Sequence, residues 1–239
     1  MPAILEKWQV QPHGQLIEID DGILTVAGEI AMPLGNFPRR MTVVRLTGER
    51  TAIWSAMALD EAGMARIEAL GRPSFLIIPN RFHRMDARIW KARYPEIVVM
   101  TPPGARAKVA EIVPVDATSD VLDDPAVQFV VVPGTGGGEA ALVIRRAGGI
   151  TIATNDVIGN VRHPHGLGAR IMVRLMSFGL SKPQIPRSVK LGLIKDRPAL
   201  AAQFRDWADM DALRRIIVSH GDPIDDPRPV LSALADGLA

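Results

Sequence analysis

Phe75-Leu-Ile-Ile-Pro-Asn-Arg-Phe-His83-Arg-Met-Asp86 joins a short apolar run to a turn, a histidine and an aspartate. Such a run predicts a buried strand, and α/β folds place functional side chains just beyond strand ends. Two later segments have the same form, Ile150-Thr-Ile-Ala-Thr-Asn-Asp156 and Ile216-Ile-Val-Ser-His220-Gly-Asp222. We therefore expect three strand ends to converge on one centre.

The composition predicts a single α/β domain spanning residues 1–239. The chain is 47% hydrophobic and 23% charged, which supports a sizeable core. The first residues lack the basic start and apolar core of a secretory signal, and no apolar run approaches the length of a membrane span. We therefore expect a cytoplasmic protein that does not bind membranes.

Cysteine usage and charge restrict the possible ligands and partners. The sequence has no cysteine, so any metal ligand must be His, Asp or Glu. The net charge is only +2, and 6 Phe, 4 Trp and 1 Tyr are too few for an obvious base-stacking surface. We expect a small-molecule substrate or an anion as the partner, and no nucleic acid; nothing in the sequence predicts an oligomeric state.

The order of predicted elements indicates two sheets packed together between outer helices. Long β-hairpin blocks argue against a doubly wound fold. The predicted strands cover residues 16–19, 23–27, 41–46, 51–55, 75–78, 97–100, 127–132, 141–145, 150–154 and 216–218, with Gly148-Gly149 as a hairpin turn. The predicted helices cover residues 60–70, 86–93, 104–111, 167–178, 199–209 and 229–238.

Each strand-end side chain has a structural and a functional interpretation. His83 suits a metal ligand or general base as well as a structural role. Asp86 fits a helix N-cap at least as well as a ligand or acid/base group. Asp156 suits an Asx-turn or a metal-binding carboxylate. His220 is more typical of a site residue, because Gly221 permits positive φ or close backbone approach beside the imidazole.

Other motifs carry weaker signals. His163 and His165 have a His-x-His spacing that can bind a metal, although a solvated loop without metal is expected for this pair alone. The loop from Pro133 to Gly138 lacks the Gly-Lys-Ser/Thr ending of a phosphate-binding loop, so we interpret it as a flexible loop without nucleotide. A serine hydrolase has no support, because there is no Gly-x-Ser-x-Gly motif.

Two short motifs make the chain similar to the metallo-β-lactamase superfamily, and to a divergent branch of unknown function in particular. They are Pro79-Asn-Arg-Phe-His83 after a strand, and Tyr94-Pro95 after a short Trp-containing helix. The resemblance extends from roughly Met41 to the end of the chain. It implies a four-layer αβ/βα sandwich, with two mixed β-sheets between helices and a site at one edge of the sheets.

The resemblance also implies a metal site, of which this sequence keeps a part. In the family's His-x-His-x-Asp-His motif, His83 takes the second His position, while Arg81, Met85 and Asp86 replace the other three ligands. The family's Pro-Gly-His-Thr turn loses its histidine here, since Thr135 follows Pro133-Gly134.

Asp156 matches the family's bridging aspartate, and His220 matches its late strand-end histidine. We therefore predict at most one metal ion, Zn or Fe/Mn, held by His83, Asp156 and His220, in a hydrolase of unknown substrate with Asp86 and His220 as catalytic side chains. The alternative is a metal-free scaffold of the same fold that binds an anionic small molecule or a protein partner, since Arg81 replaces a ligand.

Overall fold

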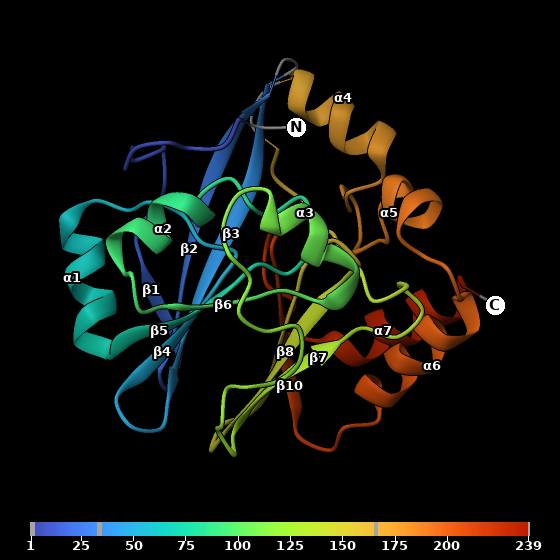
Figure 1. Ribbon diagram of the computed structural model, residues 1–239. Helices are drawn as coiled ribbons and strands as arrows, with labels where there is room; N and C mark the ends of the chain where they lie inside the picture. The colour runs from blue at the N-terminus through green and yellow to red at the C-terminus, as the bar shows by residue number, and fades with distance from the viewer. Residues whose placement is uncertain (1–2, 33–34, 165–166, 239) are drawn as a thin grey trace.

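Two β-sheets packed face to face form the centre of residues 3–32, 35–164 and 167–238, which the computed structural model describes (Figure 1). The first sheet has the order β1-β2-β3-β4-β5-β6; β1 to β4 are antiparallel, and β4, β5 and β6 are parallel. Its strands are β1 (Ile17–Asp20), β2 (Ile23–Met32), β3 (Gly35–Leu46), β4 (Arg50–Trp54), β5 (Arg72–Ile77) and β6 (Val98–Met100).

The second sheet has the order β10-β9-β8-β7, in which only β10 and β9 are parallel. Its strands are β7 (Val127–Val131), β8 (Ala140–Arg146), β9 (Gly149–Thr154) and β10 (Leu213–Val218). Both sheets are therefore mixed. The parallel pair places side chains together, because the carboxyl ends of parallel neighbours meet at one sheet edge.

Helices cover the outer faces of both sheets, so the described chain has four layers (Figure 1). The first sheet is covered by α1 (Glu61–Leu70), α2 (Ala87–Arg93) and, after a 3₁₀ turn at Pro103–Ala105, α3 (Arg106–Ala110). The second is covered by α5 (Arg187–Gly192), α6 (Arg197–Ala208) and α7 (Pro227–Asp236), while α4 (Leu167–Met176) packs against β3. In the described ranges, no helix has the length and apolar character needed to cross a bilayer.

Strand alternation explains why the central strands are apolar on both faces. In β4, Ala52 and Trp54 enter the core between the sheets, whereas Ile53 faces α1 and α2. Side chains of a strand alternate between its two faces, so a strand with helices on one side and a sheet on the other has no polar face. The indole Nε1 of Trp54 donates to Ser219 Oγ at 3.2 Å, which links the two sheets near the end of β10.

The predicted αβ/βα sandwich is confirmed, and most elements agree with the sequence expectations. In α1, the predicted caps are both present: Asp60 Oδ1 accepts from the Gly63 N–H at 2.8 Å, and the Gly71 N–H bonds to the Ile67 carbonyl. The hairpin of β2 and β3 is longer than predicted, because Gly28, Pro38 and neighbouring arginines interrupt the apolar alternation on which the prediction rested.

Two local predictions are corrected, and one helix was missed. The two-residue turn between β8 and β9 is 147–148, not Gly148-Gly149, because Gly149 pairs with Arg146 in the ladder. Helix α5 was missed, since six residues after Pro186 carry little periodicity. The glycine loop predicted as flexible is held by hydrogen bonds: Gly134 O accepts from the backbone N–H groups of residues 195 and 196 at 2.7 and 3.0 Å.

Candidate metal centre

Three potential ligand atoms from three separate segments meet at one edge of the two sheets. His83 Nε2 lies 3.0 Å from His220 Nε2 and 3.3 Å from Asp156 Oδ1, and the latter two atoms are 3.1 Å apart. A tetrahedral zinc ion with ligand bonds of about 2.0–2.1 Å places its ligand atoms about 3.3 Å from one another. The observed triangle therefore fits one ion bound by two imidazoles and a carboxylate.

Parallel pairing of β9 and β10 places two of these side chains together. Thr154 and Val218 are partners in the ladder, and the Ser219 N–H continues it by donating to Thr154 O at 3.1 Å. Asp156 and His220 each come two residues after this last pair, so they leave the sheet side by side. His83 reaches them from the first sheet, after the end of β5.

Asn80 joins the two sheets at the centre. Its amide Nδ2 donates to Asp156 Oδ2 at 2.6 Å and to Glu139 Oε2 at 2.9 Å, while its Oδ1 accepts from the His83 N–H at 3.3 Å. The backbones of Asn80 and Glu139 form an antiparallel bridge, which brings the end of the first sheet against the start of β8. One buried amide thus orients a ligand from each sheet.

The outer nitrogen of each imidazole also has a partner. His220 Nδ1 lies 2.7 Å from the Pro38 carbonyl, which can only accept, so Nδ1 carries a proton. In a neutral ring with its proton on Nδ1, Nε2 carries a lone pair, 3.1 Å from Asp156 Oδ1, and a cation between the two atoms would relieve the repulsion of their lone pairs. His83 Nδ1 lies 2.8 Å from Ser55 Oγ, which either donates or accepts. Such outer partners fix the rings of metal-binding histidines.

Burial and neighbouring groups favour the metal-binding forms of His83 and Asp156. The side chains of His83, Asp156 and His220 are only 9%, 12% and 7% exposed. Burial lowers the pKa of His83, with Asp156 opposing the shift, and so favours the neutral imidazole. Burial opposes ionisation of Asp156, but the two histidines outweigh it and hold its pKa well below the usual range. Neutral imidazole and ionised carboxylate are the ligand forms.

Glu139 is a buried acid behind Asp156 that the sequence did not single out. Its Oε1 accepts from the Asp156 N–H at 2.7 Å, and its side chain is fully buried. Burial, and then the Asp156 carboxylate, raise the pKa of Glu139 well above its usual value. The sequence feature that could have identified Glu139 is its place between the glycine loop and an apolar run, directly before the buried residues of β8.

Asp86 does not have the capping role that the sequence favoured. It occupies the N-cap position of α2, but its backbone is in the αR region and its side chain makes no capping bond. Its Oδ2 instead pairs with Arg39 Nη1 at 2.5 Å, and its Oδ1 accepts from the Ala58 N–H at 2.9 Å. Burial raises the pKa of Asp86, and Arg39 opposes that shift. Within the described chain, Nε and Nη2 of Arg39 are buried without hydrogen-bond partners.

The remaining sequence candidates lie away from the triangle. Among the described residues, the group able to hold a metal is His83, Asp156 and His220, and His163 is exposed and not part of it. His165 lies outside the described residues. Arg81 is exposed, with its guanidinium carbon 4.8 Å from the ring centroid of Phe82. Thr135 is buried and donates to the Val132 carbonyl.

Aromatic side chains cover the triangle on the His220 side. The rings of Phe37 and Phe178 lie 4.9 and 5.6 Å from the His220 ring, and both belong to an apolar cluster that includes Val173 of α4. The cavity beside His83, which Ser55 also lines, has a volume of about 40 Å³. A buried water needs about 10–15 Å³, so this space admits a few waters but no sizeable substrate without movement.

The sequence matches no family model and no curated protein. Its similarity to known proteins is therefore one of structure.

Solved metallo-β-lactamases share the fold over nearly the whole chain. DIM-1 superposes with a TM-score of 0.65 at 10% identity, covering 97% of this chain and 100% of its own. FIM-1 from Pseudomonas aeruginosa, in its mono-zinc form, gives 0.61 at 13% identity, covering 95% and 96%. The enzyme from Erythrobacter litoralis gives 0.62 at 15% identity, covering 93% and 96%. The chain therefore has the metallo-β-lactamase fold, as the resemblance predicted.

Proposed function

We propose that this protein is a metal-dependent hydrolase that binds one ion through His83, Asp156 and His220. The observation that carries the proposal is the triangle of ligand atoms, with sides of 3.0, 3.1 and 3.3 Å. Two imidazoles and one carboxylate form a ligand set used by catalytic zinc and by mononuclear iron sites. One ion is the maximum that this set supports, because the other ligand positions of the fold family hold Arg81, Met85, Asp86 and Thr135 here, and the Asp86 carboxylate is paired with Arg39.

When bound, a zinc ion in such a site lowers the pKa of its water towards about 7 and polarises a substrate carbonyl or phosphoryl group. The protein's own residues supply the geometry. Pro38 keeps the proton of His220 on Nδ1, Asn80 holds the Asp156 carboxylate, and Ser55 holds the outer edge of His83. All three contacts leave the inner ligand atoms free.

Asp86 acts as a positioning residue in this proposal. It holds Arg39, a buried cation whose charge opposes protonation of His83. The two residues also line the small cavity beside His83. Arg39 thus places a fixed positive charge at the edge of the space that a reacting group has to enter.

Metal analysis of protein purified without a histidine tag tests the proposal directly. We expect close to one equivalent of Zn, Fe or Mn per chain, or uptake of one equivalent after dialysis against these ions. The His220→Ala variant loses that equivalent, whereas His163→Ala, which removes an exposed histidine outside the triangle, retains it. Absence of metal and of uptake in the folded wild-type protein contradicts the proposal.

A second candidate is a scaffold that binds an anion without turnover. Two observations favour it: the cavity beside His83 has a volume of only about 40 Å³, and Arg39 has two buried donors without partners in the described chain. Hydrolysis of a generic ester and a generic phosphodiester separates the candidates. Turnover that His220→Ala abolishes while the far-UV spectrum stays unchanged rules out the scaffold.

A further inference from the structure

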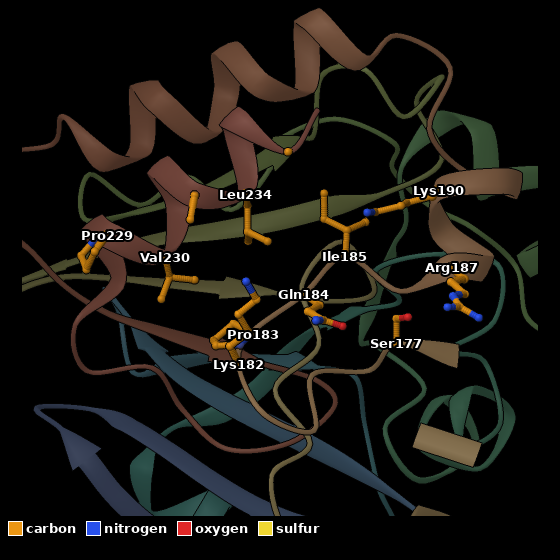
Figure 2. A pocket seen from close by; sticks show the side chains of 12 residues that line it. Ser177, Lys182, Pro183, Gln184, Ile185, Arg187, Lys190, Pro229, Val230 and Leu234 are labelled. Carbon is orange, nitrogen blue, oxygen red and sulfur yellow. The ribbon is translucent and has the colours of Figure 1, made fainter. Parts of the chain in front are cut away.

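A large cavity lies away from the metal triangle, between α5, α7 and the segment before α5 (Figure 2). Its volume is about 640 Å³, within the range of about 300–1,000 Å³ for small-molecule sites. None of its lining residues belongs to the triangle. The metal-dependent hydrolysis proposed above therefore leaves this cavity without a role.

One wall of the cavity is apolar and firmly anchored. Ile185 before α5 and Leu234 on α7 line it, and both belong to the core beneath the second sheet. Figure 2 shows Val230 and Leu234 extending from α7 toward the same space as Lys190 of α5. Side chains fixed by core packing form a wall that exists before any ligand binds, which reduces the entropic cost of binding.

The other wall is cationic and has no opposing charge. Lys182, Arg187 and Lys190 line the cavity, and no aspartate or glutamate does. In the described part of the chain none of these three forms an ion pair, whereas Arg84, Arg93 and Lys108 over the first sheet all do. The sequence from Val157 to Lys195 contains no acidic residue at all. Clustered unpaired cations around a low-dielectric wall attract anions.

We propose that this cavity binds a small amphipathic anion. Its carboxylate or phosphate head lies between Lys182 and Lys190, and its aliphatic part lies along Ile185, Val230 and Leu234. Lysine suits either head, because its ammonium group is a point charge with three donors. The apolar wall adds affinity roughly in proportion to the ligand area removed from water.

The cavity wall is bonded to the segment that follows Asp156. Gln184 exchanges two backbone hydrogen bonds with Gly159, at 2.8 and 3.0 Å, and the next residue, Asn160, donates to the His220 carbonyl at 3.0 Å. Phe178, which packs on the His220 ring, lies in the same segment as Lys182. A ligand in the cavity therefore rests on the segment that covers His220, although its binding does not require a metal.

Calorimetric titration with four probes tests the class of ligand. Decanoate and decyl phosphate carry both head and tail, decanol carries the tail alone, and inorganic phosphate carries the head alone; the amphiphiles stay below their micelle concentrations. We expect the two amphipathic anions to bind at least 10-fold more tightly than decanol or phosphate, with a negative heat-capacity change. Whichever of decanoate and decyl phosphate binds more tightly identifies the preferred head group as a carboxylate or a phosphate. Equal weak binding of all four probes overturns the proposal.

Variants locate the binding. The double variant Lys182→Gln/Lys190→Gln is expected to weaken decanoate binding at least 10-fold, and Ala233→Trp, at an exposed lining position on α7, is expected to block the cavity. Lys195→Gln is the matched control, because Lys195 is an exposed lysine of the same basic stretch that does not line the cavity. Unchanged binding in both cavity variants overturns the proposal. All variants should keep the wild-type metal content, so failure of this site and failure of the metal site are distinguishable.

Discussion

Glu139 accepts a hydrogen bond from the backbone N–H of Asp156 at 2.7 Å, in full burial. The bond crosses from the start of β8 to the turn after β9, so it fixes the direction in which the Asp156 carboxylate leaves the sheet. Asn80 closes the arrangement by donating to both carboxylates. A buried acid with this set of partners positions the Asp156 carboxylate, and in the proposed metal site it does not itself need to touch the ion.

We predict that Glu139→Ala weakens metal binding by about 10- to 100-fold, the usual effect of removing an outer partner of a metal ligand. It also leaves the buried Asp156 N–H unpaired, at a cost to folding of about 1–3 kcal/mol. Glu139→Gln keeps an acceptor for that N–H but presents an amide to the Asn80 amide. Its metal affinity should therefore fall between those of wild type and Glu139→Ala. Competition titration with a zinc chelator gives the order. An affinity in Glu139→Ala equal to wild type contradicts the positioning role.

The buried pair of Arg39 and Asp86 predicts strong coupling between the two side chains. Their side chains are 6% and 1% exposed, so removing either leaves an uncompensated buried charge. We expect Arg39→Met or Asp86→Leu alone to lower the free energy of unfolding by about 3–5 kcal/mol. The double variant should recover much of this loss, since it buries no charge. Urea unfolding of the four proteins measures the coupling, and additive losses would falsify the pairing.

The depressed pKa values of His83 and Asp156 predict a stability that falls in acid. Burial lowers the pKa of His83 in the folded protein below its unfolded value of about 6.5. Between the folded and the unfolded pKa, His83 therefore binds more protons in the unfolded chain than in the folded one. Its contribution is complete above about pH 6.5 and is lost as the pH falls towards the folded value. The stabilising contribution of Asp156 is lost at a lower pH, below about 3.9, where the carboxyl group of the unfolded chain takes up a proton before that of the folded protein.

We expect the free energy of unfolding of metal-free protein to decrease from pH 7 to pH 5, and to decrease less in His83→Gln. Urea titrations at several pH values check both curves. Parallel curves for the two proteins would show that His83 is not the group responsible. His13→Gln, which changes a histidine outside the triangle, is the control and should follow wild type.

The backbone beside His220 requires a glycine at position 221. The φ of Gly221 is 110°, and a Cβ there would lie 2.1 Å from the Asn160 carbonyl oxygen. We expect Gly221→Ala to displace His220, to lower stability by about 1–3 kcal/mol and to reduce metal uptake. Gly192→Ala is the control, because a Cβ at Gly192 meets nothing within 4 Å. Thermal unfolding and metal analysis of both variants test this. Equal melting temperatures and equal metal contents of Gly221→Ala and Gly192→Ala would count against the requirement for glycine.

Much of the fold was predictable, because its strands are short β-branched runs between clear turns. The run before Pro79 and the run ending at Thr154 mark β5 and β9, and their apolar character on both faces follows from burial between layers. The meeting of Asp156 and His220 was also predictable, since the ends of parallel neighbouring strands meet at one sheet edge. His83 follows a strand of the other sheet, so its place beside them was expected from the common strand-end pattern and from the family resemblance, and not from strand pairing. In the structure these three side chains do lie together.

The partners of these side chains were not predictable from local sequence. Arg39 and Asp86 are 47 positions apart, and no local pattern pairs an arginine in a long hairpin with an aspartate at a helix start. The cap assigned to Asp86 was wrong for that reason: local propensity favoured a cap, and a distant buried cation took the carboxylate. The positioning role of Glu139 likewise depends on the pairing that brings the start of β8 beside Asn80, which no local pattern shows.

One imidazole of the triangle comes from the first sheet, and the carboxylate and second imidazole come from the other. An ion bound there would act as a cross-link between two parts of the chain that are distant in sequence. By mass action, ion binding to the folded state raises the free energy of unfolding, by about 2.7 kcal/mol at a free concentration of 100 times the dissociation constant. Thermal stability should therefore rise with metal concentration, and it gives a measure of occupancy that needs no knowledge of the substrate.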